Sequence, residues 1–539
     1  MKIKRIGVAA IALAAAGALT LSGCTSGSPE SNEGAGSSTA IVTTNGNEPQ
    51  NPLIPTNTNE VGGGKILDSI FAGLIYYDAD GAPVNDMAES IETDDAQNYT
   101  IKIKADQKFT NGEPVTANSF VDAWNYGALL SNEQLSSYFF ESIEGFSYDE
   151  DSELTGLEVV DDLTFTVALN QPESDFPLRL GYSAFYPLPE SAFEDMAAFG
   201  ESPIGNGPYM LDGEDAWQHN EKIDLVVNPD YEGPRQPANG GLSIIFYATQ
   251  EAAYADLQGG NLDVLDAIPA GALGTYEDEF ADRSVNQAAA IFQSFTIPER
   301  LAHFAGEEGK LRRAAISKAI NREEITDVIF SGTRTPAHDF TSPVIDGYSE
   351  DIPGSDVLEF DAAAAQELWA QADAISPWTG TFQLAYNADG GHQAWVDAVM
   401  NQLKNNLGID ASGAPYPTFA ELRTAITDRT IQTSARSGWQ ADYPALFNFL
   451  GPIYGTGAGS NDGDYSNPEF DKLLEEGLAE TDLDAANEKF QQAQEILFQD
   501  LPAIPLWYAT VNGAWSETVD NVQYGWNSVP LYFEVTKSE

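Results

Sequence analysis

One carboxylate is set apart from the other acidic residues by its neighbours. Asp442 lies in residues 437–450, which read Ser-Gly-Trp-Gln-Ala-Asp-Tyr-Pro-Ala-Leu-Phe-Asn-Phe-Leu and contain no basic residue. A carboxylate among apolar and aromatic side chains either accepts hydrogen bonds from its own turn or receives a cation from another molecule. An Asx turn before Tyr443 and Pro444 would satisfy the first alternative. Under the second, residues 437–450 are where the chain meets its ligand.

The sequence lacks the usual catalytic patterns. It contains no Gly-x-Ser-x-Gly elbow and no His-Glu-x-x-His pair, and no cysteine is available as a nucleophile. The histidines lack the spacing of metal ligands; they are His219, His303, His338 and His392. A sequence with 83 Asp and Glu residues does not exclude a glycosidase-type pair of carboxylates. We nevertheless expect a protein that is not an enzyme and that has no catalytic residue, bound metal or cofactor.

The net charge argues against anionic partners. The chain has 25 Lys and Arg residues against 83 Asp and Glu residues, which gives a formal net charge of −58. A surface this acidic repels nucleic acid and anionic lipid headgroups, so we expect neither as a partner. The charge keeps the protein soluble, and it weakly favours cationic or zwitterionic ligands.

The N-terminal segment has the pattern of an export signal. Residues 2–5 are mostly basic, and residues 6–21 form an apolar run that is short for a membrane span. We therefore predict a signal peptide over residues 1–23. Residues 24–39 are rich in Ser, Gly, Asn and Glu and are predicted to form a flexible tether.

Cys24 directly follows this signal and is the only cysteine, so the chain cannot form an intramolecular disulfide. It follows Leu-Ser-Gly, a setting that resembles the lipobox of bacterial lipoproteins, in which this sulfur is diacylated. A thiol at this boundary has no core to enter, which argues against an ordinary buried cysteine. Two acyl chains hold a protein durably on a membrane. We therefore expect lipidation of Cys24 and an extracytoplasmic protein anchored to the outer face of the cell membrane.

The rest of the chain is predicted to be α/β. Apolar spacing predicts helices over residues 62–74, 250–257, 310–319, 322–330, 362–372, 392–405, 419–427, 468–477 and 485–499. Alternation and β-branched residues predict a hairpin over 157–169 and strands over 40–44, 99–104, 222–227, 242–247, 262–265, 381–386, 431–435 and 503–507. After residue 293 short strands separate the helices, which is typical of an open lobe with a largely parallel sheet. Ligands bind beyond the carboxyl ends of such strands, and residues 438–443 follow the predicted strand 431–435.

Five blocks resemble the solute-binding subunits of ATP-driven importers, in the peptide- and nickel-binding family called family 5. They occur in the family order and span nearly the whole chain after the predicted signal, so together they are specific. Oligopeptide-binding members resemble the chain most, at Gly-Trp-x-Ala-Asp-Tyr. The blocks are Asp-Ser-Ile-Phe-Ala-Gly-Leu at 68–74, Lys-Phe-Thr-Asn-Gly-Glu-Pro-Val-Thr-Ala-Asn-Ser-Phe at 108–120, Ser-Pro-Ile-Gly-Asn-Gly-Pro-Tyr at 202–209, residues 311–325, and residues 438–450 followed by 465–474.

The resemblance implies an α/β fold of the periplasmic-binding-protein type II, with two large lobes joined by hinge strands and a smaller inserted lobe. Residues 40–75, 196–293 and 512–539 would form lobe I. Residues 76–195 would form the inserted lobe, and residues 294–511 would form lobe II. The ligand would be enclosed between the two large lobes.

The resemblance also implies roles for single residues. The family aspartate that accepts a peptide α-ammonium matches Asp442. The family arginine six residues earlier, which can meet the peptide carboxylate, matches Arg436, although this side chain could equally form a structural ion pair. His392, at the head of a predicted helix, matches a histidine with a similar role. Trp439 and Tyr443 would line side-chain pockets, unless they are ordinary core aromatics.

The function implied is that of the extracytoplasmic substrate-binding component of an ABC importer. A monomer would capture a peptide, most simply an oligopeptide, by closure of its lobes and deliver it to the permease subunits. Two alternatives stay open: a binder of oligosaccharide or another small solute in the same family, and a surface-anchored hydrolase. Trp378, Trp395 and Trp439 could stack on a sugar, but a neutral sugar has no ammonium group for Asp442.

Overall fold

The computed structural model describes residues 39–538, and its largest element is a mixed sheet of twelve strands. These strands are β1 (Ile41–Gly46), β8 (Tyr209–Leu211), β9 (Trp217–Gln218), β10 (Lys222–Val227), β11 (Gly241–Phe246), β12 (Val264–Leu265), β13 (Ser284–Thr296), β14 (Arg334–Pro336), β15 (Thr381–Asn387), β16 (Asp410–Tyr416), β17 (Ser434–Gln440) and β18 (Ala503–Trp515). Their order is β16-β15-β17-β13-β18-β12-β1-β11-β10-β8, with β14 on β18 and β9 on β10. The predicted signal peptide, Cys24 and all of the predicted tether except Thr39 lie outside the described residues.

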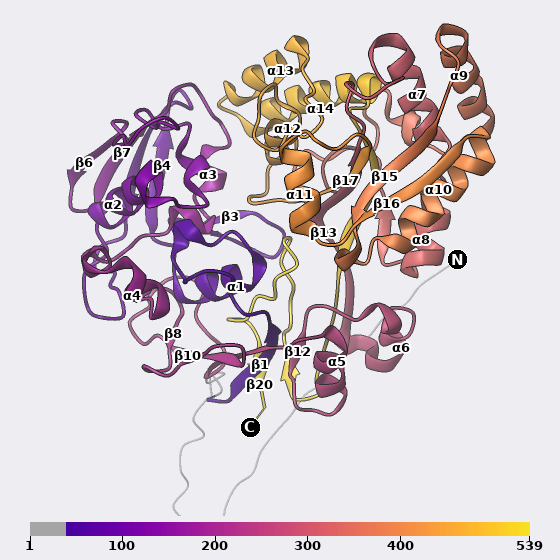
Figure 1. The fold of residues 1–539 in the computed structure, drawn as a ribbon. Coiled ribbons are helices and arrows are strands. Elements are labelled where there is room, and N and C mark those ends of the chain that lie inside the picture. Colours follow the sequence, from indigo (N-terminus) through magenta and orange to yellow (C-terminus); the bar gives the residue numbers. More distant parts are fainter. Residues whose placement is uncertain (1–38, 539) are drawn as a thin grey trace, which may run out of the picture. The chain divides into compact units, whose positions relative to one another are not determined.

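Three small sheets and the α-helices complete the described part of the chain (Figure 1). The small sheets are β4-β5-β7-β6, formed by Ala88–Thr93, Asn98–Ile103, Thr164–Ala168 and Leu157–Asp161; β2-β3, formed by Ile75–Tyr77 and Pro83–Asn85; and β19-β20, formed by Val519–Asp520 and Thr536–Lys537. The helices are α1 (Val61–Ile70), α2 (Ala117–Ala128), α3 (Phe176–Arg179), α4 (Met196–Glu201), α5 (Gln250–Gln258), α6 (Tyr276–Phe280), α7 (Gly306–Lys318), α8 (Arg322–Phe330), α9 (Ala362–Ile375), α10 (Gln393–Leu407), α11 (Phe419–Thr427), α12 (Leu446–Tyr454), α13 (Pro468–Leu478) and α14 (Leu483–Asp500). Within residues 39–538, no helix combines the length and the apolar composition that a membrane crossing requires.

Two long strands, β13 and β18, run through the middle of the large sheet. Each has 13 residues, and they pair antiparallel from Ser284 and Ala514 to Thr296 and Ala503. At one end β18 pairs with β12, and at the other β13 pairs with β17. The predicted lobe boundaries, at residues 293–294 and 511–512, fall inside these strands. The division into lobes stays a prediction, and β13 and β18 are the segments that would connect lobes I and II.

The buried apolar side chains form two large clusters. The first, which we call the first core, includes Phe71, Trp124 and Phe185, and the second core includes Phe295 and Trp507. The segment just after β17 contributes to both. Its Tyr443 and Ala445 belong to the first core, whereas Ala441 and Leu446 belong to the second core. Asp442 therefore lies where the two cores meet.

Most predicted elements are confirmed, and the main differences lie around β17. The predicted strand 431–435 begins and ends too early, because β17 takes its limits from pairing with β13, from Thr296 with Ala435 to Ile291 with Gln440. Residues 438–440 therefore belong to the strand instead of following it. The prediction of a largely parallel sheet is also only partly right. β15 is parallel to β16 and β17, but β17 is antiparallel to β13 because it joins the long central pair.

Candidate functional site

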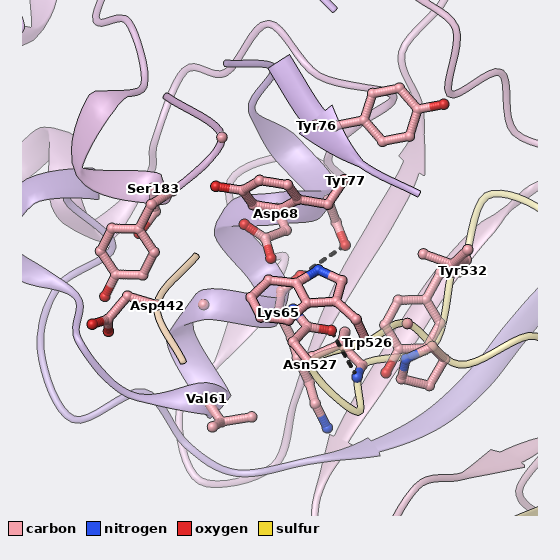
Figure 2. Close-up of a pocket in the computed structure, with 18 of the residues that line it drawn as sticks. Val61, Lys65, Asp68, Tyr76, Tyr77, Ser183, Asp442, Trp526, Asn527 and Tyr532 are labelled. Carbon is pink, nitrogen blue, oxygen red and sulfur yellow. Dashed lines mark hydrogen bonds between the residues drawn. The ribbon is translucent and has the colours of Figure 1, made fainter. Parts of the chain in front are cut away.

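A cavity of about 280 Å³ lies beside Asp442 (Figure 2). Its walls come from segments far apart in the sequence, because the large sheet and the first core bring them together. The N-terminal part of the wall comes from α1, the loop before it (both within residues 58–69) and residues 76–78 at the end of β2. The other lining residues are 181–183, Tyr186, Pro208, Tyr209, Arg235, 440–442 and most of 525–533. The cavity is thus bounded by the end of β17, by elements of the first core and by Trp526, which belongs to the second core.

Asp442 is held by one side chain of the following helix. The main chain still pairs with β13 just before it, since the Ala441 N–H donates to Ala290 O at 2.9 Å. Asn448, which is buried at the start of α12, then makes two contacts. Its Oδ1 accepts the Asp442 N–H at 3.0 Å, and its Nδ2 donates to Asp442 Oδ2 at 3.2 Å. The anchor is therefore the Asn448 amide and not an Asx turn, which was one of the two alternatives for this carboxylate.

The Asp442 carboxylate is half-buried and has no counter-ion in the part of the chain that the structure describes. Burial raises the pKa of its carboxyl to about 6, and the Asn448 hydrogen bond offsets this only in part. Within residues 39–538, no Lys, Arg or His forms an ion pair with Asp442. An ionised carboxylate in this position is stabilised most directly by a cation that enters the cavity.

A second carboxylate, that of Asp68, reaches the cavity from α1. It accepts a hydrogen bond from the Tyr186 hydroxyl at 2.8 Å. Burial raises the pKa of Asp68, while Tyr186 and Arg235 act in the opposite direction. Arg235 does not pair with this carboxylate: its Nη1 donates to the Asp68 backbone oxygen at 2.6 Å, and its Nε donates to Asp86 at 2.9 Å.

Aromatic side chains cover much of the remaining wall. Tyr77 meets Trp526 edge to face, with 5.4 Å between ring centroids and an angle of 81° between planes. Tyr182, Tyr186 and Tyr532 also line the space. Aromatic faces of this kind hold apolar stems and, through their quadrupoles, cationic groups.

Trp439 and Tyr443, the predicted neighbours of Asp442, do not line this cavity. The Trp439 indole Nε1 donates to Asn448 Oδ1 at 3.0 Å, so Trp439 helps to hold the amide that holds Asp442. Tyr443 is buried in the first core, and its hydroxyl donates to Asp175 at 2.9 Å. The structure thus places these two side chains behind the site, and their predicted contact with the ligand stays a prediction.

Arg436 and His392 also lie outside the cavity lining. Arg436 Nε donates to Asn387 Oδ1 at 2.9 Å, and its guanidinium lies 5.0 Å from the centre of the Phe419 ring. His392 precedes α10 as predicted, and its Nδ1 accepts a hydrogen bond from Trp395 Nε1 at 3.1 Å. Whether either side chain meets a ligand carboxylate stays a prediction.

Sequence reasoning missed Asn448 and most of the cavity wall. Asp68 entered it only as the first residue of a family block. A signal was present in α1, which reads Val-Gly-Gly-Gly-Lys-Ile-Leu-Asp-Ser-Ile, because Lys65 and Asp68 are the only charged residues in an otherwise apolar and glycine-rich helix. The segment 525–533 offered no comparable signal, since it forms no regular strand or helix apart from an isolated bridge.

Comparisons with known proteins place this geometry in a family context. The family model described as bacterial extracellular solute-binding proteins, family 5 middle, matches residues 82–461. The oligopeptide-binding protein OppA of Bacillus subtilis is 26% identical over 533 residues, which cover 94% of each chain. The dipeptide-binding protein DppE of the same organism is 27% identical over 514 residues, covering 90% of this chain and 91% of its own.

A solved structure shows the same fold. The Haemophilus influenzae OppA complex with the peptide RPPGFSPFR aligns with a TM-score of 0.75 and 22% sequence identity, covering 93% of this chain and 99% of that chain. The likeness confirms the predicted α/β fold of the periplasmic-binding-protein type.

Proposed function

The chain belongs to the bacterial extracellular solute-binding proteins of family 5, and from this premise we propose that it captures peptides for an ABC importer. One observation carries the choice of peptide: the carboxylate of Asp442 lines a cavity and has no counter-ion among residues 39–538. A peptide α-ammonium is a cation that fits this position. The relatives named for oligopeptide and dipeptide binding support the same choice.

In the proposed mechanism the α-ammonium donates to Asp442 while the walls exclude competing water. Removing water strengthens a charge-assisted hydrogen bond because the local dielectric falls. The side-chain amides of Gln440 and Asn527 line the same space and can bond to the peptide backbone. Ordered water would fill the space around small peptide side chains, which explains how one cavity can accept several sequences.

The remaining parts of the proposal concern the rest of the chain. Cys24 would carry the lipid anchor outside the cytoplasm, and the monomer would pass its peptide to permease subunits without catalysing a reaction. The lobes would close about β13 and β18, which extend alongside both cores. Arg436 or His392 would meet the peptide carboxylate in a closed form of the protein.

The proposal predicts selective binding of free amines. Isothermal calorimetry should show that peptides of two to five residues bind, and that the N-acetylated forms bind about 30-fold more weakly or worse, because acetylation removes the cation that Asp442 receives. A neutral oligosaccharide of similar size is the control and should not bind. If the sugar binds and no peptide does, the ligand class is wrong; release of product from a peptide or glycan would instead support a hydrolase.

The proposal also predicts a loss of affinity in acid. With a pKa of about 6, most Asp442 is ionised at pH 7 and most is protonated at pH 5, whereas the peptide ammonium stays charged throughout. The affinity for a free-amine tripeptide should therefore fall about tenfold from pH 7 to pH 5. Calorimetry across this range measures the effect, and the Asp442→Asn variant should show a flatter profile.

The stability of the empty protein should respond to this carboxyl in the opposite sense. Because the folded pKa of Asp442 is above its unfolded value, protonation favours the folded state as the pH falls through about 6. Burial also raises the pKa of Asp339 to about 6, so this core residue contributes with the same sign. The measurement that isolates Asp442 is therefore the pH dependence of affinity in the wild type compared with that in Asp442→Asn. An affinity that does not change between pH 7 and pH 5 would contradict the assigned role.

A further inference from the structure

The charges around the cavity do not balance. Its lining includes two cationic side chains, and each already has a carboxylate partner outside the lining. Lys65 forms an ion pair with Asp266, and Arg235 forms one with Asp86. Both cations are therefore already paired, although the charge of Arg235 still lowers the pKa of Asp68.

Two of the lining carboxylates are satisfied by their own backbone. Glu60 caps α1 by accepting the N–H groups of Gly62 at 2.7 Å and Gly63 at 2.8 Å. Asp78 accepts the N–H groups of Asp80 at 3.0 Å and Ala82 at 2.8 Å within its own turn. These hydrogen bonds explain why acidic residues occupy both positions without any ligand.

Asp68 and Asp442 are different, because among the described residues each carboxylate has a single neutral donor. Tyr186 supplies it to Asp68 and Asn448 supplies it to Asp442. In the part of the chain that the structure describes, neither carboxylate forms an ion pair. One α-ammonium can neutralise only one of the two, so a peptide with a neutral side chain leaves a negative charge behind in the cavity.

The two carboxylates act on the same part of the cavity. Burial raises the pKa of Tyr77 and that of Tyr182, and the charges of both Asp68 and Asp442 raise each of them further. Figure 2 shows Asp68, Asp442, Tyr77 and Trp526 around one space. An alkyl stem can lie along these rings while its charged end reaches a carboxylate.

We propose that Asp68 is a second cation-binding carboxylate of this cavity, and that it selects peptides with lysine or arginine as the first or second residue. The α-ammonium meets Asp442, and the basic side chain passes along the aromatic wall to Asp68. This specificity rests on the proposed capture of peptides. It assigns to Asp68 a role that its place in α1 alone, with one hydrogen bond from Tyr186, leaves unexplained.

The test compares peptides that differ by one charge. Calorimetry on the wild-type chain would use Lys-Ala-Ala with norleucine-Ala-Ala, Ala-Lys-Ala with Ala-norleucine-Ala, and Ala-Ala-Ala. Norleucine keeps a similar apolar stem without the ammonium. At least one lysine peptide should bind about tenfold more tightly than its norleucine counterpart. In the Asp68→Asn variant that advantage should fall to about twofold or less, because the second carboxylate is gone.

A matched control separates local contact from overall charge. Asp256 is also a half-buried helical aspartate that accepts a tyrosine hydroxyl, from Tyr247 at 2.8 Å, and it does not line the cavity. Asp256→Asn should keep the full lysine advantage. Equal binding of lysine and norleucine peptides to the wild type would overturn the inference and leave peptide capture intact, and this comparison needs no variant. An advantage that survives Asp68→Asn would overturn the role of Asp68, and failure of every peptide to bind would overturn the proposed function itself.

Discussion

Replacing Asp442 with asparagine is expected to weaken the binding of a free-amine tripeptide by about 30- to 1,000-fold. The substitution keeps the shape of the side chain and lets Asn448 remain a hydrogen-bond donor to its oxygen. It removes the only charge that an α-ammonium meets at the end of β17, so the ammonium is left desolvated without a counter-ion. Calorimetry with one tripeptide, titrated into wild type and variant at pH 7.5, measures the effect.

Two comparisons make this result specific. The N-acetylated tripeptide should bind wild type and Asp442→Asn with similar weak affinity, because it has no α-ammonium that could interact with the Asp442 carboxylate. Asp256→Asn changes the net charge by the same amount away from the cavity lining and should bind the free peptide like the wild type. If Asp442→Asn also binds the free peptide like the wild type, the ammonium is received elsewhere.

Asp442 could be found from sequence because the local pattern was unusual: a carboxylate among apolar residues with no basic residue near it. The orientation of its neighbours could not be found in this way. Trp439 and Tyr443 turn towards Asn448 and Asp175, and these contacts depend on how β17 pairs with β13 and on how two cores share one segment. The aromatic residues that do line the cavity come from other parts of the chain.

The cavity wall formed by α1 and residues 525–533 shows more clearly what could not be predicted from the sequence. Lys65 pairs with a residue 201 positions away and Arg235 with one 149 positions away. Which carboxylates around the cavity form no ion pair is therefore decided only when the chain folds. Local spacing predicted α1 because its apolar residues repeat with the helical period, but it placed the end at residue 74 instead of Ile70. No local pattern relates α1 to residues 525–533, which lie against the same space.

In the fold too, most elements defined by local periodicity were predicted, whereas β13 and the limits of β17, which depend on pairing with distant segments, were not. The helices after residue 293 were predicted near their observed positions because their apolar faces repeat regularly, except α12, which was missed. β13 was missed as one strand, and the change of texture at residue 293 falls inside it. Its burial does not alternate cleanly, because it is paired on both edges and bulges against β18 between Ala288 and Phe292.

Replacing Arg235 with methionine is expected to lower the free energy of unfolding by about 3–5 kcal/mol. Arg235 is buried, and it joins three parts of the first core: Asp86 through Nε, and the backbone oxygens of Asp68 and Phe71 through Nη1 and Nη2. Asp86 has no exposed surface, so removing Arg235 leaves a buried carboxylate without a counter-ion, held only by the neutral Tyr231 hydroxyl. Urea unfolding, followed by tryptophan fluorescence, measures the change.

Two further variants show why Arg235→Met loses stability: one in an exposed ion pair, and one that also replaces Asp86. Arg423 forms two hydrogen bonds to the carboxylate of Asp462, but its side chain is 38% exposed, so Arg423→Met should lower the free energy of unfolding by no more than about 1 kcal/mol. Adding Asp86→Asn to Arg235→Met removes the stranded charge and should recover part of the loss. If the double variant is no more stable than Arg235→Met, the loss comes from the freed backbone oxygens of Asp68 and Phe71. In that case Arg235 acts chiefly by fixing the end of α1 that carries Asp68 into the cavity.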